Sequence, residues 1–379
     1  MSEKSMQVGQ NHFVLHRWPL RSEASLRAWD AADEYLLDYL FSKGLSGNQR
    51  MLIVNDSFGA LAVALHKQKP EVMSDSFCSQ LATRYNLQAN HLSIDQVKLI
   101  SSLDDPADIL DWLVIKVPKT LALLEYQLIR LRPYITPDTQ IIIAGMVKNL
   151  PTSVWKLLER LVGVTDTSLA KKKAKLIFSQ LKPALVLPSN PYPIQYHLEH
   201  TDYIISNHAN VFSRDSLDIG TRFFLQNLPI NSNFRNIVDL GCGNGVVGLM
   251  AATKNPAATM YFVDESYMAV SSAKQNFKRV FADIRQANFM VSDGLMTFDT
   301  ESIDVVLCNP PFHQNHSISD TVATSMFKQS RYVLKKGGEL WVIGNRHLPY
   351  YSELKKIFSN CLLIASNTKF SIFKATKNI

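Results

Sequence analysis

The sequence has few cysteines and no long apolar run. Its four cysteines, Cys78, Cys242, Cys308 and Cys361, lie far apart, with no CxxC and no Cys/His spacing typical of zinc sites, so we predict reduced thiols and no metal. No run of about 18 apolar residues occurs, and the opening MSEKSMQVGQ lacks the apolar core of a signal peptide. We therefore expect no membrane partner and a protein that stays in the cytoplasm.

The composition is that of a globular protein. The 379 residues, 46% of them apolar, suffice for two domains of ordinary size. The stretch 183–201 carries four prolines and little periodicity, so we expect the domains to be 1–185 and 186–379. A net charge of +7 and a pI near 9.1 favour a polyanionic partner.

One segment, 237-IVDLGCGNGVVGLMAA-252, has the order of a strand, a glycine turn and a helix start. This order opens a Rossmann-like unit. Glycines let a ligand approach the backbone, and the helix N-terminus favours negative charge. The spacing is GxGxG, with Asp239 two residues before Gly241, whereas a dinucleotide fingerprint would read GxGxxG.

Acidic residues end the next two predicted strands. Asp264 follows 260-MYFV-263, and an acid there suits the hydroxyls of a ribose; we prefer it to Glu265, which belongs to the start of the following helix. Asp293 ends 289-FMVSD-293 and could reach an adenine amine. Because parallel strands end at one edge of a sheet, these acids predict a cleft along that edge.

A fourth strand, 303-IDVVLC-308, ends in Asn309, Pro310, Pro311 and Phe312. The side-chain oxygen of Asn309 and the carbonyl of Pro310 can both accept hydrogen bonds from an exocyclic amine, and the proline ring fixes the direction of its carbonyl. The ring of Phe312 would offer a planar substrate a stacking face, worth about 1–3 kcal/mol. For the nearby His313 and His316 we expect a capping or surface role.

These motifs together resemble the class I methyltransferases that use S-adenosyl-L-methionine and carry an [N/D]-P-P-[F/Y] motif. The resemblance implies catalytic roles for Asn309, Pro310 and Phe312. It also implies that Asp264 binds the ribose of S-adenosylmethionine and Asp293 its adenine. The methionine part of the cofactor would be held by Asp239, Gly241, Gly243, Asn244 and Gly245.

The first half of the chain repeats the order of the second in altered form. The segment 52–65 aligns with 238–251, and 111–119 aligns with 304–312. Gly59 falls on Gly245, but Asn55, Ser57, Ser74 and Lys116 fall on Gly241, Gly243, Asp264 and Asn309. We therefore predict an α/β fold of two tandem Rossmann-like class I methyltransferase domains, of which the N-terminal one is degenerate and binds no cofactor.

A two-copy chain with an intact C-terminal NPPFH is similar to the bacterial ribosomal RNA guanine-N2 methyltransferases. The segments IVNDSFGAL and CNPPFHQNHSISDTVATSMF resemble the large-subunit members more than the small-subunit members. The resemblance implies methylation of a guanine in large-subunit rRNA by a monomer. The expected RNA-binding residues, in the degenerate domain and near the C-terminus, are Lys171, Lys172, Lys173, Lys175, Lys355 and Lys356.

Several alternatives remain open at this point. The enzyme could act on small-subunit rRNA, and the same NPPF chemistry serves adenine N6, cytosine N4 or the side-chain amide of glutamine. A binding protein without activity is disfavoured by the intact glycines, Asp264 and Asn309. We also expect 212–228 to form a leading helix over the cofactor cleft, where Arg214 and Asp218 are either functional or a helix-start pair.

Overall fold

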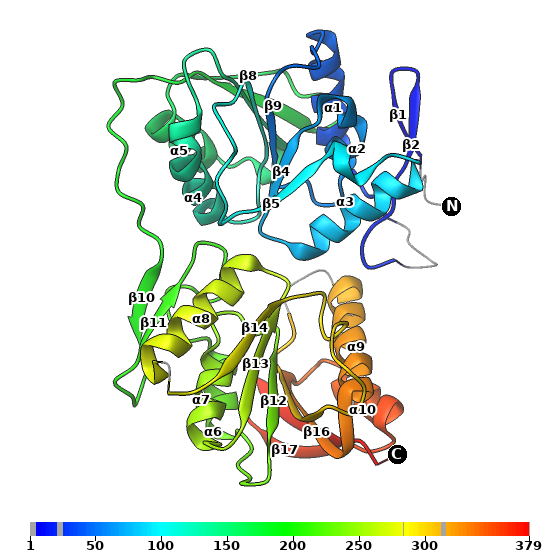
Figure 1. The fold of residues 1–379 in the computed structure, drawn as a ribbon, viewed down its shortest axis with the longest axis vertical. Coiled ribbons are helices and arrows are strands. Elements are labelled where there is room, and N and C mark those ends of the chain that lie inside the picture. The colour runs from blue at the N-terminus through cyan, green and yellow to red at the C-terminus, as the bar shows by residue number, and fades with distance from the viewer. Residues whose placement is uncertain (1–4, 21–25, 283, 312–315, 379) are drawn as a thin grey trace. The chain divides into compact units, whose positions relative to one another are not determined.

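The computed structural model describes residues 5–20, 26–282, 284–311 and 316–378. The chain forms two compact units, Met1–Tyr192 and Pro193–Ile379 (Figure 1). The division falls inside the proline-rich stretch 183–201, between residues 192 and 193, whereas the sequence placed it between 185 and 186.

The N-terminal unit is built on one large sheet with helices. Its strands are β1 Ser5–Val8, β2 Asn11–Val14, β3 Met51–Val54, β4 Glu71–Ser74, β5 Lys98–Ser101, β6 Trp112–Lys116, β7 Gln140–Met146, β8 Thr165–Thr167 and β9 Ala174–Ser179. Its α-helices are α1 Ala31–Ser42, α2 Ala60–Ala64, α3 Phe77–Ala89, α4 Leu121–Leu131 and α5 Thr152–Leu161, and its 3-10 helices are η1 His66–Gln68, η2 Ile94–Gln96, η3 Arg132–Tyr134 and η4 Val147–Asn149.

The C-terminal unit repeats this plan. Its strands are β10 Ile194–His197, β11 Ile204–Asn207, β12 Asn236–Leu240, β13 Thr259–Asp264, β14 Ala287–Val291, β15 Ile303–Cys308, β16 Leu334–Asn345, β17 Leu362–Ser366 and β18 Phe370–Thr376. Its helices are α6 Ile219–Gln226, α7 Val246–Lys254, α8 Tyr267–Phe281, α9 His316–Val333 and α10 Tyr350–Phe358.

The two seven-stranded sheets have the same strand order. It is β5-β4-β3-β6-β7-β9-β8 in the first unit and β14-β13-β12-β15-β16-β18-β17 in the second. In both, five parallel strands are followed by an antiparallel pair. The chain order reverses between β12 and β15, and ligands of such sheets bind at the carboxyl ends of the strands at this switch point. The predicted tandem α/β fold is thus confirmed.

The central strands are apolar because helices cover both of their faces. Val238, Val305 and Val306 are fully buried, and Phe224, Phe262 and Phe277 are among the largest fully buried side chains. Continuous β-branched runs of this sort are typical of parallel strands. Burial of these side chains fixes the strand ends, and with them the loops that follow.

The leading helix of the catalytic unit is shorter than predicted. α6 begins at Ile219 rather than within 212–217, because Asp218 is its N-cap and accepts hydrogen bonds from the amide of Thr221 (2.8 Å) and from its hydroxyl (3.3 Å). Arg214 bonds to Asp215 and to the carbonyl of Ala209. Asp218 is therefore the helix-start residue of the two.

The described residues contain neither a membrane-spanning helix nor a metal-binding cluster. None of the helices there is long and apolar enough to cross a bilayer. In the same part of the chain, no group of three or more His, Cys, Asp or Glu side chains is arranged to hold a metal ion.

Candidate active site

The glycine turn between β12 and α7 adopts a backbone that few other residues tolerate. Gly241, Gly243 and Gly245 have φ of 71°, 53° and 79°. A Cβ on Gly245 would lie 2.7 Å from Cβ of Ala273, so this glycine permits close packing of α7 on α8. A Cβ on Gly243 would meet nothing within 4 Å. The backbone at Gly243 is therefore open, as a turn that receives a ligand requires.

Asp264 lies directly against this turn. Its carboxylate accepts hydrogen bonds from the amides of Gly243 (2.9 Å) and Ser266 (3.0 Å). Burial raises the pKa of Asp264, while these amide bonds act in the opposite direction. The carboxylate has about four lone-pair directions, more than these amide bonds use, so the residue can still accept from ribose hydroxyls. Asp264 thus lies beside Gly243, and its contact with the ribose stays a prediction.

Two of the predicted cofactor residues use their side chains inside the protein. The buried carboxylate of Asp239 accepts from the amide of Gly248 (2.8 Å), in the first turn of α7. Burial, with a smaller contribution from the charge of Asp264, raises the pKa of Asp239 to about 8. Asn244 donates to the Tyr196 hydroxyl (3.2 Å) and accepts from the amide of Val246 (3.1 Å). We infer that both residues shape the turn.

Asp293 follows β14 at the same edge of the sheet. The amide of its neighbour Ser292 donates to the carbonyl of Asp264 (2.9 Å), which holds the two strand ends together. Gln329 of α9 covers the loop, because its side-chain oxygen accepts from the amide of Leu295 (2.7 Å). Asp293 is partly buried and remains our proposed adenine residue.

Asn309 stands at the carboxyl end of β15, next to β12. Its Nδ2 donates to Oγ1 of Thr221 (3.0 Å), and its Oδ1 is buried with no partner among the described residues. An unpaired buried acceptor is costly and calls for an explanation. An amine donor from a substrate would satisfy it.

Thr221 sets the orientation of the Asn309 amide. Its hydroxyl donates to the carboxylate of Asp218 (3.3 Å), so its oxygen lone pairs face the NH2 of Asn309. Thr221 could not be selected from sequence patterns, since it lies 88 residues before Asn309. Pro310 is buried beside the site, while Phe312 and His313 lie outside the described residues, as does the side chain of His316.

The N-terminal unit has other side chains at the glycine positions. Asn55, which aligns with Gly241, has φ of 66°, and its amide group exchanges hydrogen bonds with Gln127 (2.9 and 2.8 Å). Ser74, which aligns with Asp264, accepts only from the amide of Ser76 (3.1 Å) and offers no carboxylate. In this unit the Asn55 side chain therefore occupies the position where Gly241 has no side chain.

The catalytic position is likewise replaced by an ion pair. Lys116, which aligns with Asn309, places Nζ 2.6 Å from Asp33 and 2.9 Å from Asp30. Asp30 is the N-cap of α1 and Asp33 its third residue, the positions that Asp218 and Thr221 hold on α6. Burial alone would lower the Lys116 pKa, but the charges of Asp33 and Asp30 raise it. A paired cation cannot orient an amine.

The predicted RNA-binding lysines lie in different surroundings. Lys171 pairs with Asp38 (2.6 Å) and Lys172 with Glu34 (2.8 Å), both acids on α1. Lys173 is exposed and Lys175 is half-buried. Lys355 and Lys356 are exposed in the last turn of α10. The first two lysines are therefore partly neutralised by their neighbours.

The glycine turn with Asp264, the asparagine-proline end of β15 and the strand order together define a class I methyltransferase that uses S-adenosylmethionine. Comparison with known proteins agrees with this class. Residues 202–374 match the family described as the methyltransferase small domain, and residues 3–183 match the RLMG N-terminal domain.

Full-length relatives narrow the assignment. "Ribosomal RNA large subunit methyltransferase G" of Yersinia enterocolitica is 48% identical over 98% of this chain and 93% of its own length. The protein of the same name from Yersinia pestis is 48% identical over 98% of this chain and 94% of its own. The chain belongs to this family.

A solved structure shows the same two-unit fold. It is described as the T. thermophilus 16S rRNA N2 G1207 methyltransferase (RsmC) in complex with AdoMet and guanosine, and it matches with a TM-score of 0.76 at 19% identity. The match covers 98% of this chain and 97% of that one. At this identity the similarity concerns the fold.

Proposed function

We propose that this methyltransferase adds a methyl group to the exocyclic N2 of one guanine in 23S rRNA, which gives N2-methylguanosine. The observation that carries the proposal is the buried Oδ1 of Asn309 at the end of β15, which has no partner among the described residues. The names of the relatives, which are 48% identical, support a large-subunit rRNA substrate. The proposal includes a monomer working in the cytoplasm.

The chemistry requires an acceptor more than a base. The lone pair of an exocyclic amine is delocalised into the ring, so the amine must turn toward sp3 geometry before it can attack. Asn309 Oδ1 and the carbonyl of Pro310 would accept its two hydrogens and favour the developing positive charge. When bound, S-adenosylmethionine supplies an electrophilic methyl group. The surplus amine proton passes to water.

The residues around the turn fit the cofactor. The glycine turn, with open backbone at Gly243, would receive its methionine part, Asp264 would accept from the ribose, and Asp293 would contact the adenine. Phe312 would stack on the guanine, so Phe312→Leu should weaken the RNA step more than Phe312→Tyr does.

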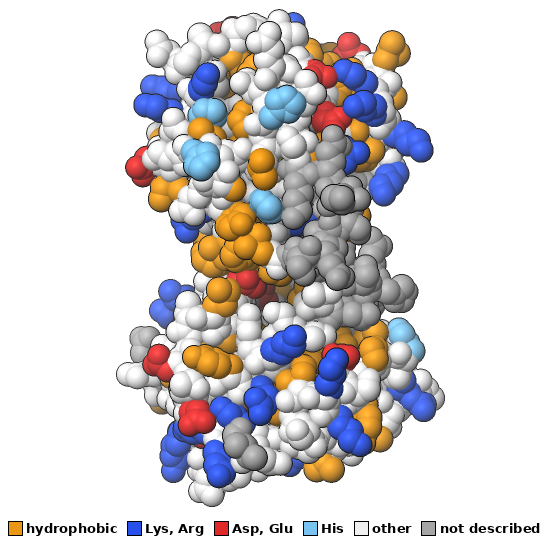
Figure 2. Space-filling view, turned by 90° about the vertical axis from the view of Figure 1, so that its right-hand side faces the viewer, with side chains coloured by type: hydrophobic (Ala, Val, Ile, Leu, Met, Phe, Trp, Pro, Cys, Tyr) orange, Lys and Arg blue, Asp and Glu red, His pale blue; other side chains and the backbone are white. Residues whose placement is uncertain are grey.

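Contacts to RNA away from the reacting base are proposed for both units. Lys and Arg side chains are more numerous than acidic ones on the face drawn in Figure 2. Lys171 and Asp38 form an exposed ion pair, which contributes little to stability, so a phosphate can replace the carboxylate. The degenerate unit would then bind RNA through Lys171 to Lys175, and α10 through Lys355 and Lys356.

Two experiments test the proposal. Nucleoside analysis of 23S and 16S rRNA from a strain lacking the gene should show one N2-methylguanosine missing from 23S rRNA. A loss from 16S rRNA, or of methyladenosine, would overturn the substrate assignment. Asn309→Ala should lower the rate by about 10²–10³ with cofactor affinity within a few fold. Asn288→Ala, a change at an exposed asparagine on β14, is the matched control.

A further inference from the structure

A pocket lies where β16 ends and β18 begins. Its volume is about 560 Å³, and it is lined by Asn345, Arg346, His347, Thr368 and Lys369. Two backbone features join its walls: the amide of Arg346 donates to the carbonyl of Lys369 (3.0 Å), and Asn345 pairs with Phe370 across the antiparallel strands. The lining residues therefore come from two connected segments with a fixed separation.

The basic side chains of this pocket are not neutralised. Within the described part of the chain, Arg346, His347 and Lys369 form no ion pair, whereas Lys374 and Lys335, on the same two strands, pair with Glu339 and Asp304 (2.8 Å each). Arg346 makes only a 3.5 Å bond to the carbonyl of Asn367. Its guanidinium therefore keeps donors that match a phosphate.

A second observation points to a hydroxyl in the ligand. Asn345, in the pocket wall, has a buried Oδ1 with no partner among the described residues. Such an acceptor needs a donor, which a phosphate cannot supply. A ribose 2′-hydroxyl can donate, and among nucleic acids it accompanies a phosphate only in RNA. The cations Arg346 and Lys369 fit the phosphate of one nucleotide, and the Asn345 Oδ1 acceptor fits its ribose hydroxyl.

The pocket and Asn309 lie at the same edge of the sheet. Asn309 bonds to Thr221, and a Cβ on the adjacent Gly220 would lie 3.1 Å from the ring of Phe370, the residue after Lys369. β15 and β16 are parallel neighbours, so both end at the same edge of the sheet. A nucleotide in the pocket would thus adjoin a guanine placed at Asn309.

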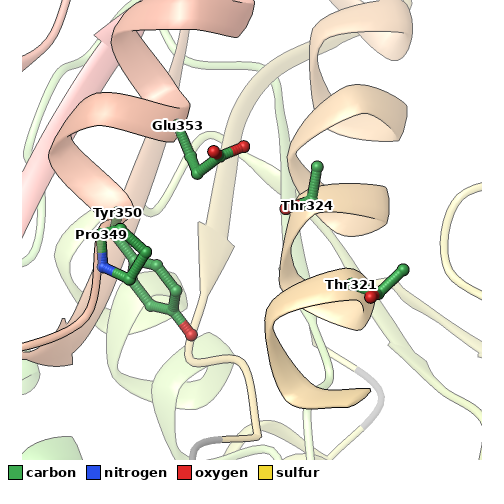
Figure 3. A pocket seen from close by; sticks show the side chains of 5 residues that line it. All are labelled: Thr321, Thr324, Pro349, Tyr350 and Glu353. Carbon is green, nitrogen blue, oxygen red and sulfur yellow. The ribbon is translucent and has the colours of Figure 1, made fainter. Parts of the chain in front are cut away.

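A second pocket, also lined by described residues of this unit, does not have the same chemistry. It measures about 300 Å³ and lies between α9 and α10, where Figure 3 shows Glu353 on one helix facing Thr321 and Thr324 on the other. It has no Lys or Arg in its lining, and Glu353 would repel a phosphate. The two pockets lie on either side of the loop after β16, and only the first suits RNA.

We propose that the pocket of Asn345, Arg346, His347 and Lys369 binds the phosphate and ribose of a nucleotide next to the target guanosine, with Oδ1 of Asn345 accepting from its 2′-hydroxyl. The inference rests on the proposed RNA substrate. It adds a site that selects RNA over DNA and that fixes the backbone of the strand beside the reacting base.

The first test measures RNA binding by full-length variants. The double change Arg346→Ala with Lys369→Ala should weaken binding of a 23S rRNA transcript about tenfold or more at 0.1 M salt. It should also lower the log-log salt slope by up to about 0.7–0.9 per lost contact. The control, Lys274→Ala with Lys278→Ala, removes two exposed lysines of α8 and should change binding less. S-adenosylmethionine affinity, measured by calorimetry, should stay unchanged in both.

The second test uses the sugar. One 2′-deoxynucleotide at a time is placed beside the target guanosine of a short RNA substrate, and KM is compared with that of the all-ribose RNA. Wild-type enzyme should show a raised KM for one flanking position, and Asn345→Ala should show no such difference. Equal KM at every position for the wild type would overturn the role of Asn345.

The outcomes separate this inference from the proposed function. If the wild-type enzyme methylates 23S rRNA but the pocket double variant binds it as tightly as the α8 control, the pocket assignment is wrong and the proposed function stands. If the wild type neither binds nor methylates the transcript or the large subunit, the proposed function itself fails.

Discussion

Asn309 Nδ2 donates a 3.0 Å hydrogen bond to Oγ1 of Thr221, and this bond fixes the orientation of the side-chain amide. The same contact exists in the other unit in changed form, as the 2.6 Å pair of Lys116 and Asp33. In both units this contact joins the end of a central strand, β6 or β15, to the first turn of the helix that precedes the sheet, α1 or α6. Thr221 is therefore a positioning residue, which acts through Asn309.

Thr221→Val should lower kcat by about tenfold or more, because the Asn309 amide loses its anchor and can turn its NH2 toward the substrate. The loss should be smaller than the factor of about 10²–10³ expected when the acceptor itself is removed. Thr221→Ser keeps the hydroxyl and should restore most of the rate. S-adenosylmethionine affinity should be unchanged in both variants, as measured by calorimetry. A Val variant with wild-type kcat would contradict the positioning role.

The glycine turn allows a test with a matched control. Gly243→Ala and Gly337→Ala both place a Cβ at positive φ, 53° and 81°, with nothing within 4 Å. Each should lose about 1 kcal/mol of stability. Only Gly243→Ala should lower S-adenosylmethionine affinity, because its Cβ would stand where the cofactor must approach the backbone. Equal affinity in the two variants would remove Gly243 from the cofactor site.

Much of this arrangement followed from the sequence alone. The alignment of the two halves placed Asn55 on Gly241. The backbone amides of these residues do make equivalent hydrogen bonds: that of Asn55 donates to the carbonyl of Met73 (3.0 Å), and that of Gly241 donates to the carbonyl of Val263 (2.8 Å). Strand order and turn position follow from apolar runs and glycine spacing, which are local patterns. The end of β15 before Asn309 could be located for the same reason, and the catalytic role of Asn309 stays a prediction.

Contacts between distant residues could not be predicted. Asn86 and Asn276 anchor the β-hairpin of each unit, with 2.8 and 2.9 Å bonds to the carbonyls of His16 and Ser206, 70 residues away in both cases. Single buried asparagines have no signature in a sequence. The pairing of Lys171 with Asp38 was missed because a run of lysines in a sequence reveals its own positive charge. It does not reveal which acidic residues the fold brings next to it.

The pKa of Asp239 predicts a pH dependence of stability. The folded carboxyl keeps its proton up to about pH 8, whereas the unfolded group ionises near 3.8. Between these values folding takes up a proton, so stability should fall by about 1.4 kcal/mol per pH unit as pH rises, and level off above about pH 8. Asp239→Asn keeps an acceptor for the Gly248 amide and removes this loss.

Urea unfolding from pH 5 to 9 would measure the effect. The stability of Asp239→Asn relative to wild type should increase with pH up to about 8, and the exposed control Asp299→Asn should show no such trend. Other buried carboxyls, such as Asp56 with its pKa raised by burial to about 6, contribute equally to both proteins and cancel in the difference. A constant difference across the range would show that Asp239 is ionised in the folded protein.

The backbone of the turn Lys171–Ala174 is strained at its two central lysines, and this strain predicts that the two lysines bind RNA. Lys172 and Lys173 have φ of 49° and 62°, and the two ends of the turn exchange 2.9 Å backbone bonds. A two-residue turn with both central residues at positive φ favours Asn-Gly, and an ordinary L residue there costs roughly 1–2 kcal/mol. Lysines at such positions are explained if their charges bind RNA.

Replacing the two lysines by the residues that the turn prefers should therefore separate stability from binding. Lys172→Asn with Lys173→Gly should raise the free energy of unfolding by about 1–2 kcal/mol and weaken binding to a 23S rRNA transcript, with the salt slope reduced by up to about 0.7–0.9 per lost contact. Lys69→Gly is the control, because Lys69 is also exposed and has φ of 49° but lies outside the turn. It should stabilise the protein and leave RNA binding almost unchanged. If the double variant and Lys69→Gly both gain stability and bind RNA equally well, the turn Lys171–Ala174 makes no contact with RNA.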